Sequence, residues 1–215
     1  LALKCVEHRK HLVTASYLSD DLTRLDAAAP PTGIILMNES GVDPGLAHAS
    51  AMKIIHHIKS IGGKLVAFKS YTGGLIAPES DDNPWGYKFT WNSRNVILAG
   101  QGTAKYIEHG KYAFIPYQKL FTRIEKIHFD ELGDFEGYAN RDSLSYRSIY
   151  GIEKIPTLIR GTLRKAGYCK AWNVFVQLGM TDDTYMIPDS QKLTIREVVE
   201  SFLPHVKGDV RNRLA

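Results

Sequence analysis

Short apolar runs alternate with amphipathic segments in the N-terminal part of the chain, and this alternation restricts the fold more than any other feature of the sequence. Apolar runs over 11–18 and 33–38 predict two strands. The second run is apolar nearly throughout, as expected for a strand that is covered on both faces. Helical patterns follow over 19–29 and 46–61, and the second pattern ends at Gly62. Strand and helix in alternation predict a parallel sheet and an α/β fold class.

The remainder of the chain mixes both kinds of pattern. Residues 64–73 and 87–91 predict strands, separated by a loop rich in Gly, Pro and Asp. Helical patterns over 93–107 and 155–180 are interrupted by glycines. Near the end, Thr194 and Glu197 stand three residues apart, which predicts a capping box at the start of a helix.

These patterns divide the chain into two parts. We expect residues 1–45 to be the C-terminal remnant of a Rossmann-like sheet, and residues 46–215 to form a mixed α/β substrate-binding domain with a helical insert. The chain begins without Met at LALKCVEHRK, a segment typical of the end of a helix. We therefore expect a piece of a longer polypeptide.

Composition and residue spacing argue against several classes of function. The chain of 215 residues has 27 basic and 23 acidic side chains, a mild excess that suits a small anionic ligand. No basic run interleaved with aromatic residues predicts nucleic-acid binding, and no apolar stretch approaches the roughly 18 residues of a membrane span. Cys5, Cys169 and the histidines have no metal-ligand spacing. We expect a cytoplasmic protein with no metal, membrane or nucleic-acid partner.

Ligands of parallel sheets bind beyond the carboxyl ends of the strands. Here those ends are Ser16 and Tyr17 after the first strand and the segment 38–43 after the second. Each also has an ordinary structural explanation. Ser16 and Tyr17 can cap the helix that follows, and Asp43 precedes Pro44 as in many turns.

Three arginines are further candidates. Arg141 lies in a polar loop, and Arg160 and Arg164 are four residues apart, on one face of the predicted helix. A guanidinium group binds a carboxylate with two parallel hydrogen bonds, which lysine cannot do. The alternative is a solvent-facing basic stripe, but the neighbouring Gly161 and Thr162 favour a binding site because they offer close backbone approach and a hydroxyl.

Longer motifs connect these candidates to a known family. TASY, NESGVDPGLAH, SYTGGLIAPESDDNPWGYKFTW, YANRDS, YGI and LIRGTLRKAGY occur in the order found in saccharopine dehydrogenase of the NADP-linked, glutamate-forming type. The sequence resembles this family along essentially its whole length, and resembles the same domain of the bifunctional aminoadipic semialdehyde synthase. The resemblance implies an oxidoreductase of lysine metabolism that interconverts saccharopine with L-glutamate and 2-aminoadipate 6-semialdehyde. It also implies NADP as the cofactor, with NAD as the alternative, a homodimer, and a mitochondrial location if the parent is a bifunctional animal or plant enzyme.

The resemblance also implies roles for individual residues. Asp43, assisted by Tyr17, is expected to move protons during the formation and breakdown of an imine. The substrate-binding residues implied are Ser16, Tyr17, Asp43, Arg141, Thr162, Leu163 and Arg164, and the cofactor-binding residues are Val42, Asp43, Pro44 and Trp91. We expect Arg141 and Arg164 to converge across a cleft on Asp43.

Two departures leave alternatives open. The sequence has no GxGxxG motif, so we expect the main phosphate-binding loop outside this chain and no activity from the chain alone. Thr72 stands where the family usually has Cys, and a hydroxyl cannot replace a thiol as a base. The alternatives are therefore a relative that acts on another carboxylated secondary amine, of the carboxynorspermidine dehydrogenase type, and a non-catalytic scaffold that forms dimers.

Overall fold

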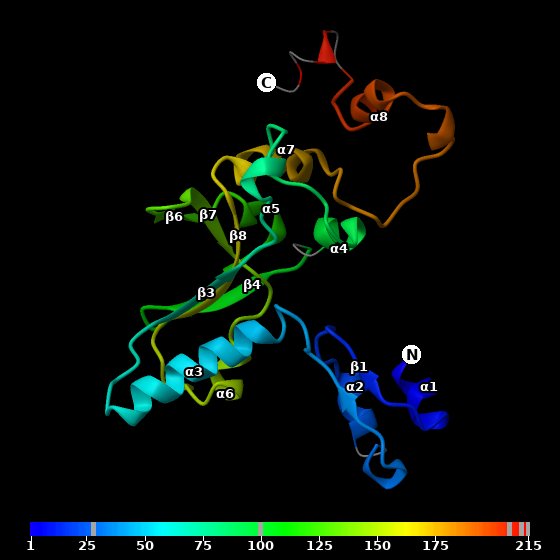
Figure 1. Ribbon diagram of the computed structural model, residues 1–215. Helices are drawn as coiled ribbons and strands as arrows, with labels where there is room; N and C mark the ends of the chain where they lie inside the picture. The colour runs from blue at the N-terminus through cyan, green and yellow to red at the C-terminus, as the bar shows by residue number, and fades with distance from the viewer. Residues whose placement is uncertain (27–28, 99–100, 206–207, 211–212, 214–215) are drawn as a thin grey trace.

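The computed structural model describes residues 1–26, 29–98, 101–205, 208–210 and 213. The α-helices are α1 (Ala2–Glu7), α2 (Asp20–Asp26), α3 (Leu46–Ser60), α4 (Ser93–Leu98), α5 (Tyr117–Leu120), α6 (Tyr146–Ile149), α7 (Tyr168–Leu178) and α8 (Ile195–Ser201). The strands are β1 (Leu12–Val13), β2 (Leu36–Met37), β3 (Phe68–Thr72), β4 (Ala104–Glu108), β5 (Lys111–Ile115), β6 (Ile124–Phe129), β7 (Gly133–Ala139) and β8 (Leu158–Lys165). Figure 1 shows a small N-terminal group, a central sheet with helices, and a C-terminal segment that carries α8 away from the sheet.

The N-terminal group contains a short parallel sheet. β1 and β2 pair in parallel, with Leu12 opposite Leu36. The two predicted strands are therefore present with the predicted direction, although each is shorter than its apolar run. The helix predicted over 19–29 is α2, and residues 27–28 lie outside the described part of the chain. The predicted α/β class is confirmed.

β8 is the centre of the second sheet. Among the described residues this sheet has six strands, in the order β5-β4-β8-β7-β6, and β3 also pairs with β8. The β3–β8 pair is parallel and the other pairs are antiparallel. Because β3, β4 and β7 all bond to β8, side chains on β8 are held from several sides.

The helix predicted over 155–180 is wrong in its first half. Residues 158–165 form β8, and only Tyr168–Leu178 is helical. The error has a physical reason, because residues four apart share a face both in a helix of period 3.6 and in a strand of period 2. Arg160 and Arg164 do lie on one face, together with Thr162, but it is the face of a strand.

Two further predictions need correction. The segment 87–91 is not a strand, and the helix predicted over 93–107 is instead α4 followed by β4. Residues 99–100 of that segment lie outside the described residues. The predicted strand over 64–73 is present as the shorter β3. The capping box of α8 is confirmed in both halves, because Thr194 Oγ1 accepts from the Glu197 N–H and the Glu197 carboxylate accepts from the Thr194 N–H.

The hydrophobic core has two clusters. Ile55 of α3 and Leu158 of β8 are fully buried in one, which also includes Tyr150. The other contains Trp172 of α7 and Tyr138 of β7. Full burial of an aliphatic side chain contributes roughly 1.5–3 kcal/mol, so Leu158 anchors the start of β8 in the core. No helix in the described part of the chain has the length and apolar character needed to cross a lipid bilayer.

Candidate active site

A tight turn places Asp43 between β2 and α3. The Gly41 N–H donates to the Pro44 carbonyl at 2.9 Å and closes the turn. Gly45 has a φ of 141°, and a Cβ there would lie 2.1 Å from the Gly41 carbonyl oxygen. Only glycine can occupy this position, because a side chain would force the turn open. The glycines of GVDPG therefore fix where the carboxylate of Asp43 points.

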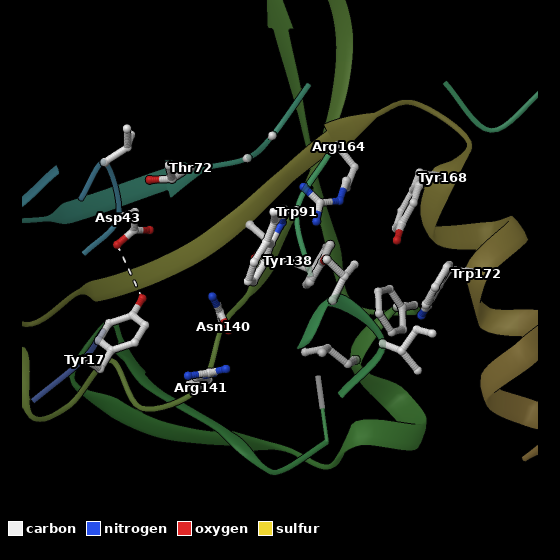
Figure 2. A pocket seen from close by; sticks show the side chains of 18 residues that line it. Tyr17, Asp43, Thr72, Trp91, Tyr138, Asn140, Arg141, Arg164, Tyr168 and Trp172 are labelled. Atoms are coloured by element: carbon white, nitrogen blue, oxygen red, sulfur yellow. Dashed lines mark hydrogen bonds between the residues drawn. The ribbon is translucent and has the colours of Figure 1, made fainter. Parts of the chain in front are cut away.

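Asp43 forms an ion pair with Arg160 of β8. A guanidinium NH2 group donates to Asp43 Oδ1 at 2.6 Å, and the two side chains are only 16% and 11% exposed. Tyr17 O–H donates to the same oxygen over 3.5 Å (Figure 2). Sequence reasoning missed this partnership, since it assigned Arg141 and Arg164 to the acid and left Arg160 without a role.

A cavity of about 540 Å³ opens beside Asp43. Several of the predicted residues line it: Tyr17, Val42, Asp43, Trp91, Arg141, Thr162 and Arg164. Figure 2 shows Asp43 and Tyr17 on one side of this cavity, Arg164 on the opposite side and Arg141 near Tyr17. Asp43, Arg141 and Arg164 thus share one cavity, as expected, although only Arg160 contacts the acid directly.

Three predicted residues lie outside the lining. Leu163 occupies the alternate position on β8, so its side chain faces the opposite side of the sheet from Thr162 and Arg164. Ser16 is exposed and its hydroxyl accepts from Thr14 Oγ1 at 3.1 Å. Pro44 is buried within the turn. Their proposed contacts with substrate or cofactor remain predictions.

Arg164 is buried without a carboxylate partner among the described residues. The residue is 8% exposed, and its guanidinium carbon lies 4.7 Å from the centre of the Tyr87 ring and 5.3 Å from that of Tyr168. One NH1 group donates to the Leu163 carbonyl at 3.1 Å, while Nε is buried with no partner. A buried cation that lacks a counter-ion favours an anionic ligand.

The nearest acid on the neighbouring strand is occupied elsewhere. Glu136 of β7 stands opposite Arg164 in the register, but its carboxylate accepts from the Gly167 and Cys169 N–H groups, both at 2.8 Å. These groups begin α7, where a negative charge is stabilised by unpaired N–H groups and by the helix dipole. Glu136 therefore fixes α7 and leaves the guanidinium of Arg164 available to a ligand.

Arg141 has a different environment. It is exposed, has a φ of 49°, and its guanidinium carbon lies 5.5 Å from the centre of the Tyr17 ring. Its backbone carbonyl accepts from the Lys105 N–H at 2.8 Å, which ties the loop to β4. Arg141 is thus a long cationic side chain at the edge of the cavity, and its backbone is fixed by a hydrogen bond to β4.

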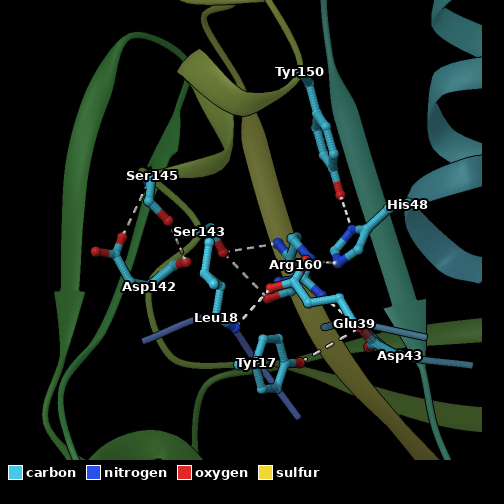
Figure 3. Close-up of polar contacts among 10 residues, drawn as sticks. All are labelled: Tyr17, Leu18, Glu39, Asp43, His48, Asp142, Ser143, Ser145, Tyr150 and Arg160. Atoms are coloured by element: carbon cyan, nitrogen blue, oxygen red, sulfur yellow. Dashed lines mark hydrogen bonds and ion pairs between the residues drawn. The ribbon is translucent and has the colours of Figure 1, made fainter. Parts of the chain in front are cut away.

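A single histidine, His48, lies near the ion pair and contacts Tyr150, Glu39 and Tyr146 (Figure 3). His48 Nδ1 is 2.7 Å from the Tyr150 hydroxyl, and His48 Nε2 is 3.6 Å from Glu39 Oε2. The imidazole also stacks on Tyr146, with 5.3 Å between ring centres. Burial lowers the pKa of His48 and the charge of Arg160 lowers it further, while Glu39 and Asp43 oppose this shift. The ring is therefore neutral near pH 7.

Tyr17 is also perturbed by the site. Burial raises the pKa of its hydroxyl, and the carboxylate of Asp43 raises it further, against the lowering effect of Arg160 and Arg141. The hydroxyl thus keeps its proton near neutral pH and acts as a hydrogen-bond donor.

Residues suited to a nicotinamide ring are present at the cavity. Val42 is 66% exposed and Trp91 is 61% exposed, and both line the cavity. Two exposed apolar side chains beside a polar site fit the face of a flat aromatic ring. Thr72 of β3 also lines the cavity, directly opposite Thr162 in the register. Within the described ranges no group of His, Cys, Asp and Glu side chains is arranged to hold a metal ion.

Together, the fold and the cavity define an α/β domain in which one carboxylate and two arginines line a cavity at the boundary between a short parallel sheet and a mixed sheet. Residues 41–208 match the family model described as saccharopine dehydrogenase C-terminal domain. The chain belongs to this family.

Individual relatives agree with this assignment. The chain is 41% identical over 196 residues to a saccharopine dehydrogenase [NADP(+), L-glutamate-forming] of Schizosaccharomyces pombe, an alignment that covers 90% of this chain and 44% of the relative. It is 38% identical over 203 residues to the mitochondrial alpha-aminoadipic semialdehyde synthase of Mus musculus, covering 93% of this chain and 22% of that protein. The chain therefore spans less than half the length of these relatives.

A solved structure has the same fold. It is an apo histidine-tagged saccharopine dehydrogenase (L-Glu forming) from Saccharomyces cerevisiae, which superimposes with a TM-score of 0.84 at 35% identity. The match covers 99% of this chain and 48% of that one, so it includes both the N-terminal group and the central sheet.

Proposed function

We propose that the protein containing this chain is an NADP-dependent saccharopine dehydrogenase of the glutamate-forming type, and that this chain supplies the substrate side of its active site. The observation that carries the proposal is the cavity that Asp43 shares with two arginines, Arg141 and Arg164, which have no carboxylate partner in the described ranges of the chain. The Schizosaccharomyces pombe relative described above has this activity in its name.

The charges of the cavity match those of the proposed substrate. Saccharopine consists of two amino acids joined through one secondary amine, so it carries three carboxylates and at least one ammonium group. Arg164 receives one carboxylate by charge-assisted hydrogen bonds, with the hydroxyl of Thr162 beside it. Arg141 receives another carboxylate at the edge of the cavity. A polyamine substrate would instead require more acids than this cavity holds.

Asp43 and Tyr17 move and orient the proton of the substrate amine. The formation and hydrolysis of an imine require protons to move to and from nitrogen and water. Asp43 accepts a proton from the amine, and the Tyr17 hydroxyl, which stays protonated near pH 7, orients the acid. Thr72 lies close enough to line the same cavity but is not needed as a base in this scheme.

Val42 and Trp91 would hold the nicotinamide on their side of the cavity, with Pro44 supporting the turn that carries Val42. When bound, the cofactor would supply the hydride acceptor or donor for the carbon of the substrate imine. Val42 and Trp91 would shield the ring from water, and Asp43 lines the same cavity next to Val42. The phosphates are held by residues outside this chain, whose sequence contains no GxGxxG motif.

The organisation of the parent protein is part of the same proposal. Residues 1–45 belong to the nucleotide-binding unit and residues 46–215 to the substrate unit. The protein is a homodimer, supported by the exposed Tyr112 and Phe114 on the edge strand β5. It acts in the cytoplasm, or in mitochondria if it is fused as in the mitochondrial relatives.

The test is NADP⁺ reduction by the complete protein in the presence of saccharopine. In Asp43→Asn we expect turnover to fall by about 10²- to 10⁴-fold, the range for a lost general acid–base group, with a much smaller change in the KM for saccharopine. Asp81→Asn is a matched control, because Asp81 also pairs with a β8 cation, Lys165, but lies outside the cavity. Wild-type turnover in Asp43→Asn contradicts the catalytic role, and no saccharopine oxidation by the wild type contradicts the function.

A further inference from the structure

We propose that Arg160 is a positioning residue of this active site. It fixes one oxygen of Asp43 by an ion pair and so presents the other oxygen, Oδ2, to the amine of the substrate. The proposal rests on the proposed function for the identity of the amine, but the geometry of the pair stands by itself.

Arg160 is held rigidly before any ligand binds. The residue is 9% exposed, and its guanidinium carbon lies 4.0 Å from the centre of the Tyr146 ring, within cation–π range. Its backbone N–H donates to Ser143 Oγ at 2.9 Å, and its carbonyl accepts from the Asn140 N–H at 2.9 Å. The side chain thus has a fixed backbone and a fixed aromatic surface below it.

The two oxygens of Asp43 are not equivalent. Oδ1 accepts from Arg160 at 2.6 Å and from Tyr17 at 3.5 Å. No group in the described part of the chain donates to Oδ2, although Asp43 lines the cavity. Two hydrogen bonds fix the position of Oδ1, and the second carboxylate oxygen, Oδ2, can accept a hydrogen bond from a ligand. An ammonium or protonated secondary amine is such a donor.

The pair also joins the two halves of the site. Asp43 comes from the turn after β2, whereas Arg160 is on β8, which carries Thr162 and Arg164 on the same face. One strand therefore sets both the site for the amine and the site for a carboxylate. Thr162 and Arg164 follow Arg160 at alternate positions, so the spacing between the two sites is the spacing of a strand.

Removing the guanidinium would leave the carboxylate largely buried without its partner. A lost partner in such a pair costs more than the pair itself contributes, because the remaining charge is poorly solvated. The other ionisable groups that face the pair are Tyr17, Glu39, His48, Arg141, Tyr146 and Tyr150. Arg160 is the cation in direct contact with Asp43, so its loss changes the charge balance most.

The test compares Arg160→Gln, Arg160→Lys, Asp43→Asn and the double variant Arg160→Gln with Asp43→Asn in the complete protein. We expect Arg160→Gln to lower kcat about 10- to 100-fold, as misplacement of a reacting group does. The KM for saccharopine should change much less than kcat, because Arg141 and Arg164, the proposed partners of its carboxylates, are unchanged. Arg160→Lys should restore part of the rate, and the double variant should be no slower than Asp43→Asn.

Lys165→Gln is the matched control. Lys165 lies on the same strand and pairs with Asp81, but it does not line the cavity, so kcat should stay as in the wild type. An Arg160→Gln protein that is folded and keeps the kcat of the wild type overturns the proposal. So does a double variant whose loss is the product of the two single losses.

A second measurement separates this proposal from the proposed function. If the wild type does not oxidise saccharopine, the proposed function is wrong. The positioning of Asp43 is then tested by the unfolding midpoints of the wild type, Arg160→Gln, Asp43→Asn and the double variant. Non-additive losses of stability for Arg160→Gln and Asp43→Asn support the fixed pair. Additive losses overturn it.

Discussion

Two arginines, Arg160 and Arg164, lie on the same face of β8, but among the described residues only Arg160 has a carboxylate partner. Arg160 pairs with Asp43 at 2.6 Å over the ring of Tyr146. Arg164 contacts the rings of both Tyr87 and Tyr168, with no carboxylate partner among the described residues. Both residues are similarly buried, at 9% and 8% exposure. Burial therefore does not distinguish them; the presence of an internal counter-ion does.

The difference indicates which cation is structural and which is open to a ligand. At the Arg160 end the protein supplies its own anion, so the pair is complete without substrate. At the Arg164 end Glu136, the acid in register, is used by the start of α7. A buried arginine without an anion is costly to the folded state, and a carboxylate ligand relieves that cost. The same strand thus holds one satisfied and one unsatisfied charge.

For the comparison of the two arginines, the largest expected effect comes from Arg164→Met in the complete protein. Because the truncation removes a desolvated partner of a ligand carboxylate, worth about 2–4 kcal/mol, the KM for saccharopine should rise roughly 30- to 1,000-fold. The free energy of unfolding should not fall, since an unpaired buried charge is removed. Steady-state kinetics and urea unfolding measure the two quantities.

Lys165→Met provides the control for this experiment, because Lys165 is the adjacent cation on β8 but faces away from the cavity. An unchanged KM in Arg164→Met would show that the two ends of β8 do not differ in the way described.

A smaller effect is expected from Gly161→Ala, which changes β8 between its two arginines. A Cβ at this position would lie 2.3 Å from Tyr71 Cε1 and 2.6 Å from the Tyr138 carbonyl oxygen. Both atoms must shift, and overpacking of this kind costs about 1–3 kcal/mol of unfolding free energy. Chemical denaturation measures the loss. In Gly74→Ala the nearest atom is Thr90 Oγ1 at 4.0 Å, so that control should change stability little. Equal stability of the two variants would contradict the close packing of Tyr71 on β8.

The smallest effect concerns the neutral histidine behind Arg160. Burial, and then Arg160, lowers the pKa of His48 from its usual value of 6.5, so the unfolded chain binds a proton more readily than the folded one. The associated stability is fully present above pH 6.5 and is lost as the pH falls through the folded-state value. His48→Gln should therefore weaken the dependence of unfolding free energy on pH below 6.5.

His56→Gln is the matched control for this measurement, because His56 is exposed on the same helix, α3. Unfolding curves at several pH values between about 5 and 7.5 measure the effect. If His48→Gln has the same pH dependence as the wild type, the histidine contributes nothing to acid sensitivity.

Local patterns predicted some features of this molecule and not others. The alternation of strands and helices around 11–61 and the capping box at Thr194 depend on neighbours in sequence, and both are present. The sequence predicts a helix where β8 lies, because residues four apart share a face in both a helix and a strand. The pairing of β8 with three other strands, which decides the matter, depends on segments far away in sequence.

The site shows the same division. The resemblance to a known family led to Asp43, Arg141 and Arg164, which share one cavity. Arg160 was noticed only for its spacing, since nothing local indicates that it meets an acid 117 residues earlier in the chain. A sign was available, however: a turn whose glycines fix a carboxylate needs a cation nearby if that carboxylate is to be buried.

The separation of 117 residues between Asp43 and Arg160 also affects how the molecule folds. Closing so long a loop is entropically unfavourable, and contacts between distant segments slow the folding of a chain. During synthesis the turn at Asp43 leaves the ribosome long before β8. The carboxylate of Asp43 therefore stays solvated until β8 has formed. Assembly of the Asp43–Arg160 pair is therefore a late event in folding, and any delay in forming β8 delays the cavity with it.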